Sequence, residues 1–198
     1  MRRIAALLFL APLTVASGQA TAASNRSLMV QPSALEDSLL SIPSSSQRAR
    51  AVRSYAQTDD RATLLSAMRI ARTIPSSEDK SRLLESLAPR YLGSGDRRLY
   101  TAFFRVARTV PSSEELRDLL IDVVPFAATS DELAIAILDV AQTVPSSPDR
   151  SDVLTALVES GAVRSNDVRE SFADVLQTIP AEQDRQRVAR AAMKAVKE

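Results

Sequence analysis

Residues 73–77 read TIPSS, and this pentapeptide returns in nearly the same form at four other places in the chain. The other copies are SIPSS at 41–45, TVPSS at 109–113, TVPSS at 143–147 and TIPA at 178–181. Their prolines lie 32, 36, 34 and 35 residues apart, a period in the range of helical-repeat proteins. Five such copies do not arise by chance, so the sequence predicts one structural unit repeated about five times.

Each repeat proline marks the end of a predicted helix. Counting back from each of the last four prolines, apolar residues occupy the first, fourth, fifth and eighth positions, as in Ile74, Ala71, Ile70 and Ala67. This spacing places them on one face of an α-helix. Proline then prevents further winding, because it lacks an N–H and disfavours helical angles in the residue before it.

A second helix is predicted to begin directly after each proline. Ser76, Ser112 and Ser146 each precede an acidic residue by three positions, which is the spacing of a capping box. Ala181 replaces the serine in the last copy, and its helix should therefore begin less stably by about 1 kcal/mol.

The second helix of each repeat carries apolar residues at positions 8, 9, 12 and 13 after the proline, again a helical stripe. Pro89 and Pro125 both lie 14 residues after a repeat proline, directly after this stripe, and there we expect the helix to end or kink. Polar, turn-rich segments follow and lead into the next repeat.

Together these patterns predict an all-α protein, a short right-handed α-solenoid of about five two-helix repeats with a period of about 34 residues. The predicted ten helices of about 14 residues pair as 33–57, 60–92, 96–128, 131–161 and 166–198. The proline turn could instead join successive repeats, so the pairing phase stays open.

The start of the chain indicates export. Arg2 and Arg3 make a short basic start, residues 4–15 form an apolar run, and Ala20 and Ala22 supply the small residues of a cleavage site. We interpret 1–22 as a signal peptide, 23–32 as a flexible segment and 33–198 as a single repeat domain. An uncleaved anchor is the alternative, although the apolar run is shorter than a membrane span. The expected location is the periplasm or the extracellular space, with no transmembrane segment left after cleavage.

Composition excludes several classes of function. The chain has no His and no Cys, which removes the common zinc, haem and iron–sulfur ligands and every Ser–His or Cys–His catalytic arrangement. Its 25 basic and 24 acidic residues lack the excess of positive charge typical of nucleic-acid binding. We therefore predict no catalytic, metal or cofactor site, no nucleic-acid partner and no enzymatic activity.

The stretch TIPSSEDKSRLL at 73–84 resembles the HEAT-like αα-hairpin repeats of proteins exported by bacteria. The likeness extends over residues 33–198 and implies an interaction scaffold. Tetratricopeptide repeats have the same period and are the second choice, because their Trp, Gly and Tyr signature positions are absent here.

Two enzymatic interpretations compete with helix capping. Ser77 and Lys80 match the S-x-x-K spacing of serine β-lactamases, but the S-D-N and K-T-G motifs are missing. One acidic residue per repeat could indicate paired catalytic carboxylates, namely Asp79, Glu115, Asp149 and Asp184. A cell-envelope hydrolase using such groups is the alternative function, and a purely structural spacer is the other.

Basic residues form the candidate binding site. Arg69 and Arg72 in the second repeat, and Arg105 and Arg108 in the third, occupy matching positions six and three before the proline. Residues three apart on a helix are neighbours, and equivalent positions in adjacent repeats stack, so a two-by-two arginine patch is predicted. Its expected partner is a protein or peptide with acidic groups; a solvated face without a partner is the alternative.

Overall fold

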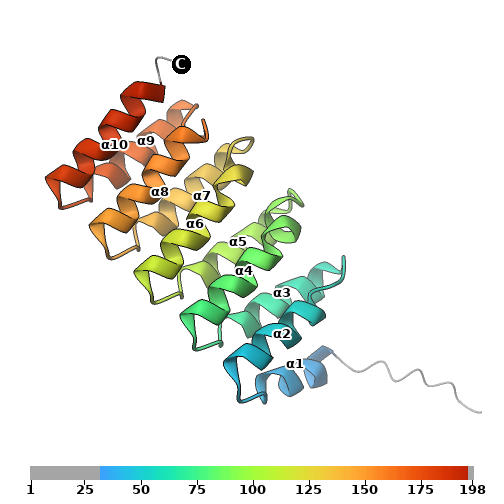
Figure 1. The fold of residues 1–198 in the computed structure, drawn as a ribbon. Coiled ribbons are helices and arrows are strands. Elements are labelled where there is room, and N and C mark those ends of the chain that lie inside the picture. The colour runs from blue at the N-terminus through green and yellow to red at the C-terminus, as the bar shows by residue number, and fades with distance from the viewer. Residues whose placement is uncertain (1–31, 196–198) are drawn as a thin grey trace, which may run out of the picture. The chain divides into compact units, whose positions relative to one another are not determined.

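The computed structural model describes residues 32–195, which belong to one compact unit. Within this range the chain forms ten α-helices and no strand, which confirms the predicted all-α class (Figure 1). The helices are α1 Pro32–Leu40, α2 Ser45–Tyr55, α3 Arg61–Ala71, α4 Ser77–Leu92, α5 Arg97–Ala107, α6 Ser113–Ala127, α7 Asp131–Ala141, α8 Ser147–Glu159, α9 Asn166–Gln177 and α10 Glu182–Ala195. The predicted signal peptide at 1–22 and nearly all of the segment 23–32 lie outside the described residues.

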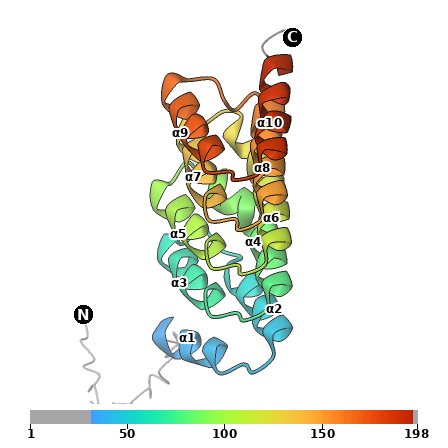
Figure 2. The same cartoon turned by 90° about the vertical axis from the view of Figure 1, so that its left-hand side faces the viewer.

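The helices form two layers. Each odd-numbered helix packs against the next odd-numbered one from α1 to α9, and each even-numbered helix does the same from α2 to α10. Figure 2 shows the two layers side by side. One contains α3, α5, α7 and α9, and the other contains α2, α4, α6, α8 and α10. In the middle of the chain, α4 packs on α5 and α6 on α7, across the polar turns. The helices joined by these polar turns contact each other more closely than the helices joined by the proline turns. This favours the alternative in which the proline turn connects successive repeats and each pair consists of the helices on either side of a polar turn.

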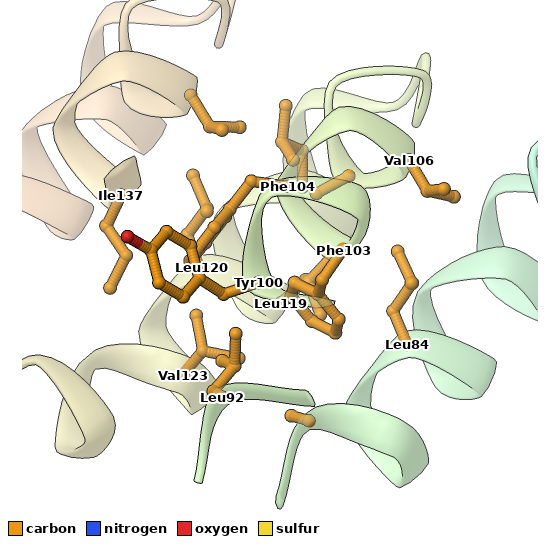
Figure 3. Packing of buried hydrophobic residues seen from close by; sticks show 14 of the residues in the cluster. Leu84, Leu92, Tyr100, Phe103, Phe104, Val106, Leu119, Leu120, Val123 and Ile137 are labelled. Carbon is orange, nitrogen blue, oxygen red and sulfur yellow. The ribbon is translucent and has the colours of Figure 1, made fainter. Parts of the chain in front are cut away.

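The core lies between the layers and consists of the predicted apolar stripes. The residue before the repeat proline is buried in four repeats, at Ile74, Val110, Val144 and Ile179. In the middle of the unit, Phe103 of α5 is fully buried between Leu84 and Leu119 (Figure 3). Burial of such apolar surface is the main favourable term for a fold without disulfides.

The serine caps form as predicted. The side-chain oxygens of Ser76, Ser112 and Ser146 accept a hydrogen bond from the backbone N–H three residues later, at 3.2 to 3.3 Å. The reciprocal bond of a capping box is replaced at Ser146, whose own N–H donates to Ser113 Oγ of the preceding repeat at 3.3 Å. The caps therefore also help to join neighbouring repeats.

The helices do not end at their internal prolines. The helix α4 continues beyond Pro89 to Leu92, and α6 continues beyond Pro125 to Ala127. Both prolines lie in the last turn of their helix, where a missing N–H removes a bond close to the end. Of the two outcomes expected there, an end or a kink, the end of the helix at the proline is therefore wrong.

A cation five residues after the repeat proline connects several repeats to the next. Arg48 Nη2 donates to the Ile42 carbonyl of its own turn at 2.6 Å, and its Nη1 donates to the Thr73 carbonyl of the next turn at 3.0 Å. Arg150 makes the same pair of bonds, to the Val144 carbonyl at 2.6 Å and to the Thr178 carbonyl at 3.0 Å. These bonds fix the distance between consecutive proline turns.

Lys80 and Leu116 occupy the equivalent position in the second and third repeats. Lys80 Nζ donates to the carbonyl and hydroxyl oxygens of Thr109, at 3.0 and 3.1 Å. We call the bonds made by Arg48, Lys80 and Arg150 the inter-repeat clamp. Leu116 cannot form it, and the next residue, Arg117, instead bonds Asp149 of the fourth repeat at 2.9 Å. The clamp was not predicted from the sequence.

Candidate functional site

The four predicted site arginines all lie on the odd-numbered layer. Arg69 is in the last turn of α3 and Arg72 is its C-cap, while Arg105 and Arg108 hold the same places on α5. All four are exposed, and α3 packs directly against α5. The pairs therefore lie on adjacent helices of one surface.

Two of these arginines have carboxylate partners in neighbouring repeats. Arg69 Nη2 lies 2.9 Å from Glu36 Oε1 of α1, and Arg108 Nη2 lies 3.5 Å from Asp139 Oδ2 of α7. Arg72 and Arg105 have no ion pair within the described residues 32–195. The predicted patch of four equivalent arginines is thus divided into two paired and two unpaired side chains.

A groove of roughly 410 Å³ lies between the exposed sides of α5 and α7 on this surface. Its α5 wall is basic and contains Arg97, Arg105 and Arg108, and its α7 wall contains Glu132 and Asp139. The two walls therefore differ in charge, which orients any ligand that lies across them.

The floor of the groove is apolar. It is formed by Tyr100 and Phe104 of α5 together with Ile135 and Ala136 of α7. The rings of Phe103 and Phe104 pack edge to face with centroids 5.4 Å apart, so core packing holds the position of Phe104 (Figure 3). Phe104 lies off the main apolar stripe of α5 because it faces this groove.

Glu132 is already engaged within the groove. The Tyr100 hydroxyl donates to Glu132 Oε2 at 2.5 Å. Burial, together with this hydrogen bond and the charge of Glu132, raises the pKa of the Tyr100 hydroxyl, which therefore stays protonated as the donor. Asp139 pairs with Arg108, whereas Glu132 accepts a hydrogen bond from a neutral hydroxyl and keeps its negative charge.

Arg97 was missed in the sequence-based prediction. It lines the α5–α7 groove and also a second groove of about 510 Å³ between α3 and α5, as do Thr101 and Arg105. These three residues follow each other at four-residue intervals on α5, and that spacing was the available signal. Arg97 has no hydrogen bond or ion pair from its side chain among the described residues.

The S-x-x-K interpretation is not favoured by the geometry. Both hydrogen bonds of Lys80 Nζ go to Thr109, and the side chain is only 4% exposed. Lys80 is therefore part of the inter-repeat clamp.

Two of the four one-per-repeat carboxylates, Asp149 and Asp184, also have local partners. Asp149 Oδ1 accepts a bond from Arg117 at 2.9 Å, and Asp184 Oδ1 accepts one from Arg187 at 3.1 Å. In the range 32–195, no three acidic side chains are grouped as a metal site would require. No helix in that range is long and apolar enough to cross a membrane.

Comparison with known proteins gives no family for this chain. No family model matches it, and searches of curated proteins and of solved structures found no match.

Proposed function

We propose that the protein is an exported, non-enzymatic α-solenoid of about five HEAT-like two-helix repeats that binds a protein or peptide on its odd-numbered layer. The periodic proline turns and the recurring inter-repeat clamp support the solenoid. Tetratricopeptide-like repeats remain the second choice. Export rests on the signal-peptide pattern of residues 1–22.

The observation that carries the binding proposal is the unpaired positive charge on the odd-numbered layer, where Arg97 and Arg105 line the α5–α7 groove. Arg72, Arg97 and Arg105 are exposed and have no carboxylate partner among residues 32–195, whereas Arg69 and Arg108 are neutralised. A ligand that brings carboxylates to this surface gains charge-assisted hydrogen bonds without first breaking an existing ion pair. Arginine also suits bidentate carboxylate recognition, because its donors form a planar fork.

The test is retention of proteins from the native envelope fraction by the immobilised mature protein. We expect Arg72→Glu/Arg105→Glu to lose its specific partner, as identified by mass spectrometry and then confirmed with the purified partner at two salt concentrations. Arg169→Glu is the matched control, because Arg169 is an exposed arginine on α9 of the same layer. Equal retention by all three proteins would contradict the proposal and leave the spacer interpretation.

A further inference from the structure

The charges, spacing and apolar floor of the groove between α5 and α7 indicate which kind of ligand it binds. We infer that it binds an extended acidic peptide segment in which two carboxylates four residues apart flank an apolar side chain. This inference rests on the proposed function and specifies the partner segment that the odd-numbered layer recognises.

The charge of the segment follows from what is already paired. On the α7 wall, Glu132 accepts from Tyr100, and Asp139 pairs with Arg108. On the α5 wall, Arg97 and Arg105 have no such partner among the described residues. The groove therefore has two unpaired positive charges, those of Arg97 and Arg105, against the one negative charge of Glu132, and the complementary ligand is anionic.

The spacing of the carboxylates follows from the helix. Arg97 and Arg105 are eight residues apart, and at 1.5 Å per residue their Cα atoms are about 12 Å apart along the axis of α5. An extended peptide rises about 3.3 Å per residue, so residues four apart are separated by about 13 Å. Residues i, i+2 and i+4 of an extended peptide also point to the same side. One carboxylate can thus face each arginine.

The residue between the two carboxylates then faces the floor of the groove. The floor is formed by Phe104, Tyr100, Ile135 and Ala136, all at least partly buried. An apolar side chain placed there would lie against this surface and be removed from water. The ligand pattern is therefore acid-x-apolar-x-acid, in which x is any residue.

A pair of labelled peptides with the same composition tests this pattern. Acetyl-GSDSFSESG-amide has the predicted spacing, and acetyl-GSSDEFSSG-amide places the two acids side by side. With the mature protein in fluorescence-anisotropy titrations at low salt, we expect the first peptide to bind on the order of tenfold more tightly, equivalent to about 1.4 kcal/mol. Equal affinities, or no binding of either peptide, would overturn the inference.

Variants of two equivalent alanines locate the peptide. Ala136 lies in the floor of the α5–α7 groove, and Ala102 lines the neighbouring groove between α3 and α5. Ala136→Phe should fill the first groove and weaken binding by about tenfold, whereas Ala102→Phe should leave it unchanged. The opposite result would place the peptide between α3 and α5 and would contradict the inference.

Charge reversal provides the second readout. Arg97→Glu/Arg105→Glu should abolish the preference between the two peptides, and Arg169→Glu should retain it. Circular dichroism and thermal unfolding of every variant confirm that the helices are intact.

The two proposals can fail separately. If the peptide does not bind but retention of the envelope partner still requires Arg72 and Arg105, the groove inference is wrong and the proposed function stands. If retention is also unaffected by those substitutions, the proposed function is wrong as well.

Discussion

Lys80 illustrates how a single buried cation links two sequence repeats. Its side chain is 4% exposed, and its Nζ bonds both oxygens of Thr109 in the next repeat. Burial lowers the pKa of Lys80, and the nearby charge of Arg72 lowers it further. A buried donor of this kind is tolerated only when its partners are present.

Lys80→Met should destabilise the protein, because it removes these bonds and leaves the Thr109 carbonyl without its donor. We expect a loss of about 1–3 kcal/mol in the free energy of unfolding, measured by urea denaturation. Arg82→Met is the control on the same helix, since Arg82 makes an exposed i,i+4 ion pair with Glu78. That control should cost no more than about 1 kcal/mol. Equal losses in the two variants would show that the clamp adds no stability of its own.

Asp149 makes the corresponding contact where the clamp is missing. Burial acts to raise the pKa of its carboxyl, but hydrogen bonds from Ser113, Ser146 and Arg117 together lower the pKa below the ordinary value of 3.8. The folded state therefore favours the charged carboxylate. Its contribution to stability is fully present above pH 3.8 and is lost as the pH falls through the lower pKa of the folded state.

Asp149→Asn should accordingly destabilise the protein more at neutral pH than in acid. The difference in free energy of unfolding between wild type and variant, followed by denaturation from pH 7 to pH 2, should decrease once the pH falls below about 3.8. Asp174→Asn is the control, because Asp174 is exposed and has no ion pair within residues 32–195. A difference that stays constant with pH would contradict this account.

At the scale of single helices, the sequence was sufficient to predict those features that depend on interactions between residues close together in the chain. The serine caps bond residues only three positions away, and the apolar stripes depend only on helical periodicity. The predicted helix ends at Pro89 and Pro125 were wrong because the sequence does not say how close these prolines lie to the end of the helix. The packing of α4 on α5 across a polar turn also requires contacts that no local pattern encodes.

Capping offers a paired prediction on two equivalent turns. Ser112→Ala removes the oxygen that accepts from the Glu115 N–H and should lower stability by about 0.5–2 kcal/mol. Ala181→Ser supplies the missing oxygen at the start of α10 and should raise stability by a similar or smaller amount. Thermal unfolding of both variants tests this, and a stabilising Ser112→Ala or a destabilising Ala181→Ser would refute the assignment of these positions as caps.

At the scale of the whole molecule, the candidate site was only partly predictable. The four arginines were found because they repeat in the sequence, and the structure places them on one layer. Their pairing was not foreseen, because Glu36 and Asp139 belong to other repeats and reach the arginines only through the packing of α1 on α3 and α5 on α7. The groove likewise depends on two helices that are far apart in the chain.

The predicted signal peptide leads to a test of where the exported protein begins. Because Ala20 and Ala22 are the small residues that signal peptidase accepts, the mature protein should begin at Ala23. N-terminal sequencing of protein purified from the envelope fraction or the medium measures this directly. Retention of Met1 there would instead indicate the uncleaved anchor.

The inter-repeat clamp has a consequence for how such a chain gains or loses length by gene duplication. Arg48 and Arg150 use the same two acceptors, one in their own proline turn and one in the following turn. Duplicating or deleting one complete period that contains the clamp would recreate a cation and a threonine carbonyl at the new junction, whereas an insertion of any other length would leave a part-buried donor without its acceptor. Duplicating the repeat that contains Leu116 would instead produce another junction without a clamp. Selection on these few polar atoms would thus preserve the period of the chain while permitting the number of periods to drift.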